Sequence, residues 1–372
     1  MIRKLNTLAF MLVVAAGAAL LGWRLVAQSG TPPVSAPGAS GVSGVSGVSG
    51  VSGVSGASAW LDGGVTRAFD ARVAAAMPPP RAMSRVLNGL LYAVTGDPDP
   101  QVRSGCRGWL FLADETVETP AGERNLRERV ALARKLVDTL GKRHVHVLAV
   151  PVPDKVEQAA GELCGLAVSP QARGRRDAWR RASAALALPQ VDLHSGWSAP
   201  GYWRTDSHWN RAGAKFAAAR VAALAQPLAP AGETAMRLQV GTQSHPRIGD
   251  LMRLAALERN APPFAPPADV DHDETLDITH DGGLLDAVAG PAVMLAGSSY
   301  SLNSGFIDYL QLDLKQEIAQ QSQLGSGFDG SVLDLLQHHP ERLDGIRLLI
   351  WEWPLRSLYQ PLTDNERAFL TQ

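Results

Sequence analysis

Three short apolar runs, separated by stretches with helical spacing, constrain the fold of this chain more than any other feature. Residues 144–151, 293–296 and 346–353 resemble buried strands, and a helical pattern over 122–141 precedes the first of them. This helix-loop-strand order is typical of a parallel α/β sheet. We therefore expect an α/β body that begins near Gly105, and the 45% of hydrophobic residues suffices to fill its core.

Five further elements follow from the same patterns. They are helices over 171–187 and 210–225, a helical segment around 249–252, and strands at 191–193 and near 314–319. The segment around 249–252 lies between proline-rich linkers at 227–232 and 261–267.

The first 27 residues combine a cationic start with an apolar run from about Thr7 to Trp23. This run is at the lower end of the roughly 17–25 residues that span a bilayer, and it exceeds the about 7–15 residues of a signal-peptide core. The one passable cleavage site follows Ala27, with Leu25 where a small residue is preferred. We therefore expect an uncleaved signal anchor with the rest of the chain exported; a cleaved signal peptide is the alternative.

Residues 28–58 contain mainly Gly, Ser, Pro, Ala and Val, with a strict Ser-Gly-Val repeat over 40–56. Such a tract lacks charges and large apolar groups, which predicts a flexible tether. The expected organisation has four parts. They are a cytoplasmic end with the anchor helix (1–27), a disordered linker (28–58), an N-terminal helical extension (59–104) and the α/β domain (105–372).

The composition narrows the function only slightly. A formal net charge of −1 gives no reason to expect a nucleic-acid partner, and no cofactor is implied. Nine tryptophans suit either carbohydrate contacts or an ordinary core. Cys106 and Cys164 can form a disulfide if the domain is exported, or remain as two buried thiols.

A carboxylate and an imidazole lie two residues apart at Asp206 and His208. On an extended or turn backbone these side chains project to the same side, so Asp206 can orient His208. Ser299 follows the predicted strand 293–296 on a tight turn, which is where open α/β sheets place their chemistry. Together the three residue types predict a hydrolase or acyltransferase triad.

Other interpretations of these features stay open. Asp206 can cap the helix that begins near Asn210, and Ser299 can simply satisfy a turn. A metal site is a further alternative, formed by His144 and His146 with the Asp206-x-His208 pair. The five arginines over 171–187 indicate a solvated helix face, or else a patch for an anionic polymer or headgroup.

The segment 202–213, followed much later by 297–301, resembles the permuted SGNH-like domain of the alginate O-acetyltransferases of the AlgJ/AlgX family. In ordinary SGNH hydrolases the serine comes first, whereas here the order is Asp, His, Ser. The resemblance spans roughly residues 105–360 and is closest to the membrane-anchored AlgJ type, because no added carbohydrate-binding module follows. Further matching segments are 108–111 with Glu115, 151–155 and 351–356.

The resemblance implies an SGNH hydrolase-like three-layer α/β/α domain with a parallel sheet, attached to the N-terminal signal anchor by the flexible tether. It makes Ser299 the nucleophile, His208 the general base and acid, and Asp206 its orienter. The backbone N–H of Ser299 would contribute to an oxyanion hole, with Asn303 as a second donor.

Four other residues are candidates near this site. Tyr202 and Tyr300 flank the triad, and each can bind sugar or pack in the core. Glu352 and Arg356 lie at the carboxyl end of the last predicted strand, where site residues are expected, and Arg356 is a candidate to contact the substrate or the oxyanion. No metal is expected among the site residues.

The implied activity is a periplasmic O-acetyltransferase that acts on an exopolysaccharide, alginate-like or cellulose-like, through an acetyl-serine intermediate. A polytopic membrane O-acyltransferase would supply the acetyl group, and the inner membrane and other polysaccharide-secretion components are the remaining implied partners. The alternatives are a carbohydrate esterase or deacetylase, and a non-catalytic polysaccharide-binding assembly protein. The basic helix and the tryptophans predict an extended groove for the polymer.

Overall fold

The computed structural model describes residues 80–197, 200–279 and 290–372, together with a few isolated positions before residue 24. The predicted signal anchor and tether, and the extension as far as residue 79, lie outside these ranges apart from those isolated positions. No helix among the described residues is long and apolar enough to span a bilayer. The chain divides into two units, Met1–Ser84 and Arg85–Gln372, and the second contains the fold described below.

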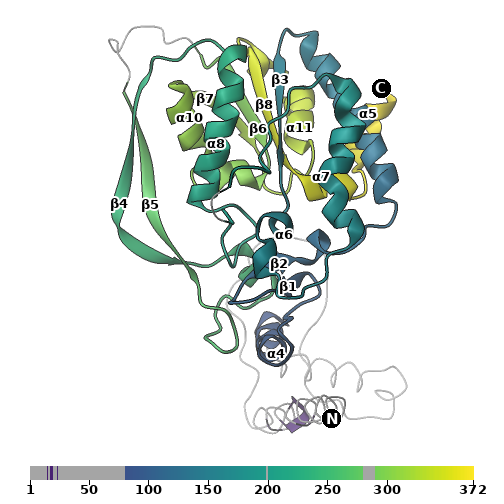
Figure 1. Ribbon diagram of the computed structural model, residues 1–372, viewed down its shortest axis with the longest axis vertical. Coiled ribbons are helices and arrows are strands. Elements are labelled where there is room, and N and C mark those ends of the chain that lie inside the picture. Colours follow the sequence, from purple (N-terminus) through teal and green to yellow (C-terminus); the bar gives the residue numbers. More distant parts are fainter. Residues whose placement is uncertain (1–14, 16, 20–22, 24–79, 198–199, 280–289) are drawn as a thin grey trace, which may run out of the picture. The chain divides into compact units, whose positions relative to one another are not determined.

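A four-stranded parallel sheet with the order β3-β8-β6-β7 forms the centre of this unit (Figure 1). Three strands lie close to the predicted runs, whereas β7 begins later than predicted because Leu314 still belongs to a helix. In a parallel sheet the carboxyl ends of all strands meet at one edge. The strands are β3 (His146–Val152), β6 (Val293–Gly297), β7 (Ile318–Ser322) and β8 (Leu348–Pro354).

Successive side chains of the strands face two separate cores, as the pleat of a sheet requires. In β3, for example, Leu148 and Val150 face one core, and Val147 and Ala149 face the other. Helices cover both faces of the sheet (Figure 1), so the predicted three-layer α/β/α arrangement is confirmed. The first core includes α8 (Arg211–Ala225) and α10 (Phe306–Leu314), and the second includes α5 (Gly122–Gly141), α11 (Gly330–His338) and α12 (Asp364–Thr371).

Two sequence predictions around these helices need correction. The helix expected over 171–187 is α7 (Pro170–Ser183), which continues only as a 3-10 turn to Leu186. The strand expected at 191–193 is absent, although the N–H of Val191 donates to the carbonyl of Ala149 on β3 at 2.9 Å. This segment therefore touches the sheet edge with a single bridge and does not extend the sheet.

A long antiparallel ribbon, formed by β4 (Ala235–Arg247) and β5 (Asp269–Thr279), was not predicted. It lies beside α8 and α10 in Figure 1, and the expected helical segment, α9 (Asp250–Leu254), falls in the connection between its strands. No strand pattern predicted this ribbon, because β5 is rich in acidic residues and β4 contains Pro246, both of which are unusual in strands.

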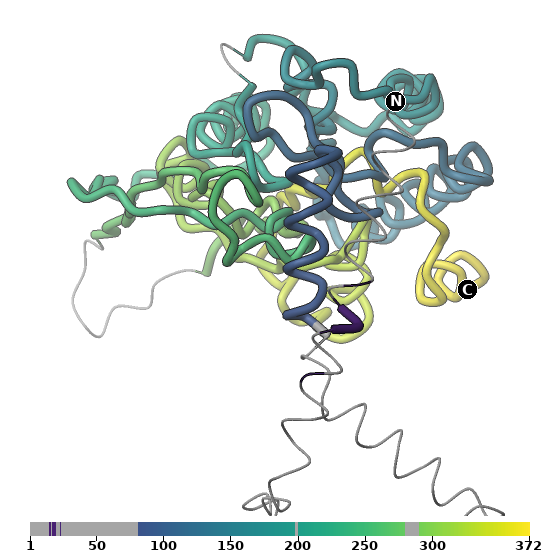
Figure 2. Tube along the Cα trace, turned by 90° about the horizontal axis from the view of Figure 1, so that it is seen from below, coloured from purple at the N-terminus to yellow at the C-terminus, as the bar shows by residue number. Residues whose placement is uncertain are grey.

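A smaller layer lies next to the carboxyl edge of the sheet. It contains the hairpin of β1 (Val102–Ser104) and β2 (Leu110–Leu112), the short helix α6 (Lys155–Gln158) and the part of α4 (Pro80–Thr95) that begins at Arg85. Figure 2 shows the blue tube of α4 in front of the domain, and the Asn88 side chain donates to the carbonyl of Ala255 at 2.8 Å. The hairpin pairs Val102 with Leu112 and Ser104 with Leu110 in antiparallel register.

Cys106 and Cys164 form a disulfide across a separation of 58 residues. Of the two alternatives that the sequence left open, the structure therefore shows the bridge. It joins the β1–β2 hairpin to the loop that follows α6, close to the elements that carry the candidate site.

Candidate active site

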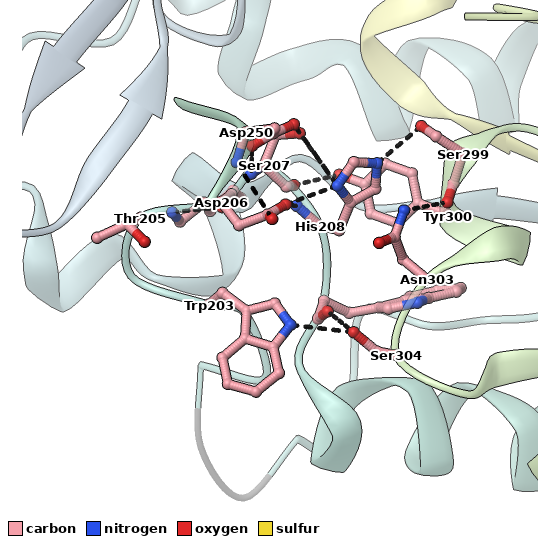
Figure 3. A network of polar contacts seen from close by, with 12 residues as sticks. Trp203, Thr205, Asp206, Ser207, His208, Asp250, Ser299, Tyr300, Asn303 and Ser304 are labelled. Atoms are coloured by element: carbon pink, nitrogen blue, oxygen red, sulfur yellow. Dashed lines mark hydrogen bonds and ion pairs between the residues drawn. The ribbon is translucent and has the colours of Figure 1, made fainter. Parts of the chain in front are cut away.

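Asp206, His208 and Ser299 converge although about ninety residues separate the serine from the other two (Figure 3). The Nδ1 atom of His208 lies 2.6 Å from Oδ1 of Asp206, and its Nε2 atom lies 2.7 Å from Oγ of Ser299. The order carboxylate, imidazole, hydroxyl is that of a hydrogen-bonded nucleophilic triad. Asp206 does not cap α8, because Asn210 occupies the N-cap position and accepts from the N–H of Gly213.

The turn that carries Ser299 is held by a buried carboxylate on the neighbouring strand. Glu352 of β8 accepts the backbone N–H and hydroxyl of Ser298, both at 2.8 Å, and those of Ser301 at 3.1 and 2.7 Å. Burial raises the pKa of Glu352, and the hydrogen bonds from Ser301 and Ser298 oppose that shift. With two serines of the turn committed to Glu352, Ser299 is the one that faces His208.

Asp206 is surrounded by groups that stabilise its charge. Its Oδ2 atom lies 3.1 Å from Nη2 of Arg247 and 3.3 Å from the backbone N of Asp250. Burial alone would raise the pKa of Asp206, but the hydrogen bond and charge of His208 and the charge of Arg247 outweigh it and hold the pKa well below its usual value. Asp206 is therefore ionised throughout the physiological range.

The backbone around Asp206 rests on a buried lysine that the sequence analysis did not single out. The Nζ atom of Lys155 donates to the carbonyls of Leu110 at 2.6 Å, Arg204 at 2.9 Å and Asp206 at 2.9 Å. Burial lowers the pKa of Lys155 to about 8, and nearby carboxylates, Glu115 first, oppose that shift. The family-like segments 108–111 and 151–155 thus meet at one cation, which lies over the rings of Trp109 and Phe111.

Three residues that the sequence offered as ligand contacts are internal supports in this structure. The hydroxyl of Tyr300 donates to the carbonyl of Ser207 at 2.7 Å, and the hydroxyl of Tyr202 donates to the carbonyl of Pro153. Both rings are buried, so the core-packing alternative describes them. Arg356 donates through Nη1 to Tyr300 and to the buried carboxylate of Glu115, each at 3.2 Å.

Asn303 lies beside Ser299 at the end of the 3-10 turn Ser299–Leu302 (Figure 3). Its Nδ2 atom donates to the backbone carbonyl of Ser299 at 2.8 Å, and its Oδ1 atom accepts from Arg247 at 3.3 Å. Sequence reasoning named Asn303 but missed Arg247, because an isolated arginine at a strand end carries no recognisable pattern.

Asp250 is a further site residue that the sequence did not assign. It accepts the N–H of Ser207 at 2.6 Å, and its Oδ2 atom lies 3.6 Å from Nδ1 of His208. Asp206, His208 and Asp250 are the one cluster with metal-ligand spacing among the described residues. His144 and His146 do not join it, so the metal set considered from the sequence is not assembled.

The arginines of α7 have several different roles. Arg175 is buried and pairs with Asp154 at 2.8 Å, so it belongs to the core and not to a solvated face. Arg176 and Arg180 instead line a cavity of about 430 Å³ beside the carboxyl end of β3. Asp206, His208 and Ser299 do not line this cavity, so the cavity is separate from the candidate active site. The extended groove for a polymer stays a prediction.

A parallel α/β sheet between two helical layers, with a serine, a histidine and an aspartate joined at its carboxyl edge, defines a protein of the SGNH hydrolase-like class. The family model described as SGNH hydrolase-like domain, acetyltransferase AlgX, matches residues 102–355, and the chain belongs to that family. The sequence resemblance is thereby confirmed, and the family description supports the predicted class of enzyme, an SGNH-type acetyltransferase.

Two curated relatives are similar to this chain over most of its length. The chain is 27% identical over 334 residues to the probable alginate O-acetylase AlgJ of Pseudomonas aeruginosa, and 26% identical over 313 residues to that of Azotobacter vinelandii. These alignments cover 83% and 80%, respectively, of each chain in the pair.

Two solved structures share the fold. The O-acetyltransferase domain of Pseudomonas putida AlgJ matches with a TM-score of 0.62 and 23% identity, covering 73% of this chain and 99% of that domain. Pseudomonas aeruginosa AlgX matches with a TM-score of 0.55 and 18% identity, covering 73% and 65%.

Proposed function

We propose that this protein is a periplasmic O-acetyltransferase that acetylates hydroxyls of an alginate-like exopolysaccharide through an acetyl-serine intermediate. The observation that supports it most is the continuous relay from Asp206 through His208 to Ser299, with 2.6 and 2.7 Å between the bonded atoms. The curated relatives are named alginate O-acetylases, which supports a uronic-acid polymer as the acceptor in preference to a neutral glucan.

The proposed reaction has two half-reactions at Ser299. First, Nε2 of His208 takes the hydroxyl proton while Oγ attacks the acetyl carbonyl carbon, and the proton then passes to the departing group of the donor. Second, His208 takes the proton of a sugar hydroxyl, whose oxygen attacks the acetyl-serine, and returns that proton to Oγ. Asp206 fixes the imidazole tautomer and stabilises the imidazolium in both steps.

The backbone N–H of Ser299 and the amide of Asn303 are the proposed donors for the oxyanion. The Nδ2 group of Asn303 carries two hydrogens, and the carbonyl of Ser299 accepts one of them. The other can be offered to the developing negative charge. Loss of one such donor typically costs about 3–4 kcal/mol of transition-state stabilisation.

The acetyl donor and the location follow from the same proposal. Acetyl-CoA is confined to the cytoplasm, so an exported enzyme needs acetyl groups passed outward, and a polytopic membrane O-acyltransferase is the proposed source. An anchor within residues 1–27 would keep the domain at the inner membrane near that source and near other secretion components.

An esterase or deacetylase is the second candidate function, because the same triad serves both and only the acceptor differs. A purely binding protein is less well supported, since it has no use for a hydroxyl bonded to a carboxylate-oriented imidazole.

Mass spectrometry separates these functions. The full-length chain is incubated with an activated aryl acetate and either oligomannuronate or cello-oligosaccharide. We expect oligomannuronate to gain acetyl groups with wild type, and Ser299→Ala to abolish the gain. Loss of acetyl from a pre-acetylated oligomer, without gain on the bare one, would establish the deacetylase instead. An inert wild type would support the binding protein.

A further inference from the structure

We propose that Arg247, at the base of the β4–β5 ribbon, is a positioning residue that holds both the triad carboxylate and the amide of Asn303 in their working orientations. This inference rests on the proposed function, and specifically on acylation of Ser299, which a transferase and an esterase share.

The first contact fixes the carboxylate of Asp206. One oxygen, Oδ1, accepts from Nδ1 of His208 at 2.6 Å and from the backbone N of that residue at 3.0 Å. The other oxygen, Oδ2, lies 3.1 Å from Nη2 of Arg247. Because each oxygen has its own partners, the carboxylate cannot rotate without breaking a charge-assisted bond.

The second contact fixes the amide of Asn303. The same Nη2 atom of Arg247 lies 3.3 Å from Oδ1 of that side chain. A guanidinium carries donors only and the Ser299 carbonyl accepts only, so the two contacts together select the orientation in which the oxygen faces Arg247 and Nδ2 faces Ser299. Removal of the guanidinium takes away one of these two restraints, so the amide turns over more readily and presents an acceptor to the oxyanion that acylation creates.

Arg247 itself is held outside the α/β core. Its guanidinium lies over the ring of Trp203, with 5.0 Å between Cζ and the ring centroid, and Nη1 lies 3.9 Å from Asp271 on β5. The side chain comes from the last residue of β4, so the ribbon delivers a charge that no element of the central sheet supplies.

Arg211 provides a matched control on the neighbouring helix. Its Nε atom lies 2.6 Å from Oδ1 of Asp271, and its Nη1 atom lies 3.4 Å from Glu274. It therefore anchors the same ribbon through the same carboxylate, but the ion pairs and hydrogen bonds of its side chain reach neither Asp206 nor Asn303.

Acylation of the full-length chain by an aryl acetate tests the proposal. We expect Arg247→Met to lower kcat by about 10- to 100-fold, as misplacement of catalytic groups by an ångström does, while KM stays the same. Added guanidinium ion should restore part of the lost rate, and Arg247→Lys should retain more activity than Arg247→Met. Arg211→Met should leave kcat unchanged even if it lowers the melting temperature.

Equal losses in Arg247→Met and Arg211→Met, or no loss in either, would overturn the proposal, because the arginine would then merely support the ribbon. The low-field NMR signal of the His208 Nδ1 proton, assigned through His208→Asn, gives a readout without turnover. Arg247→Met should shift it and Arg211→Met should not. If wild type fails to acylate, the proposed function fails, and this signal still decides the role of Arg247; an unchanged signal counts against it.

Discussion

At the scale of single residues, the site depends on two buried ionisable groups, Glu352 and Lys155, and on the half-buried Arg247, which orient other groups. Glu352 of β8 accepts hydrogen bonds from the serine turn. Lys155 donates to the backbone carbonyl of Asp206, and Arg247 donates to the carboxylate of Asp206. A buried polar group without hydrogen-bond partners costs free energy of folding, so each of these side chains favours the one arrangement of its neighbours in which it is fully hydrogen-bonded. The Ser299 hydroxyl is placed by this surrounding network as much as by its own turn.

Glu352 gives the residue-scale prediction. Glu352→Gln replaces one acceptor oxygen by a donor, so part of the Ser298 and Ser301 hydrogen bonding is lost. We expect a loss of about 1–3 kcal/mol in the free energy of unfolding. A fall in kcat for aryl acetate should accompany it. Chemical denaturation and steady-state kinetics measure the two effects.

The exposed Glu341 is the control for this change, since its side chain is 66% accessible. Glu341→Gln should leave both quantities at wild-type values. If Glu352→Gln behaves in the same way, the carboxylate does not organise the turn.

At the scale of elements, the site is assembled from three separate parts of the fold. The sheet supplies the serine turn, the loop before α8 supplies Asp206 and His208, and the ribbon supplies Arg247. The β1–β2 hairpin contributes the carbonyl of Leu110 to Lys155. The hairpin supplies no side chain to the Asp206–His208–Ser299 relay, so we expect its covalent link to the rest of the chain to affect stability more than acylation.

The disulfide between Cys106 and Cys164 provides the element-scale prediction. It closes a loop of 58 residues, so its removal should cost about 2–4 kcal/mol of the free energy of unfolding, mainly because the unfolded chain gains freedom. Cys106→Ala combined with Cys164→Ala should lower the denaturation midpoint and leave acylation at 25 °C intact. A reductant that leaves the wild-type midpoint unchanged would contradict this expectation.

At the scale of the whole molecule, the net charge of −1 provides no general attraction for an anionic polymer. Binding of a polyuronate must then rely on local cations. Arg180 is 72% accessible at the cavity beside β3, and together with Arg176 it is a candidate for such a contact.

Salt titration therefore distinguishes the acceptors. We expect oligomannuronate binding to weaken steeply as ionic strength rises, because exposed charge pairs are screened, and cello-oligosaccharide binding to be indifferent to salt. Isothermal titration calorimetry at several salt concentrations measures this, with Arg180→Ala expected to flatten the slope. Salt-independent binding of both oligomers would favour a neutral polymer.

Sequence patterns alone indicated a parallel α/β sheet and three candidate site residues, Asp206, His208 and Ser299. Both are local signals: alternation and helical spacing report which face is buried, and Asp-x-His and a serine after a strand are short motifs. The resemblance to the AlgJ/AlgX family then gave each of the three residues an expected role.

Only the tertiary structure decided which groups support those three residues. Glu352, Lys155 and Arg247 act on partners 40 or more residues away, through contacts that no local spacing encodes. The ribbon was missed because its acidic strand lacks the apolar alternation by which strands are recognised. Tyr202 and Tyr300 packed inward because burial depends on what the rest of the chain places over a side chain, and that is a property of the fold.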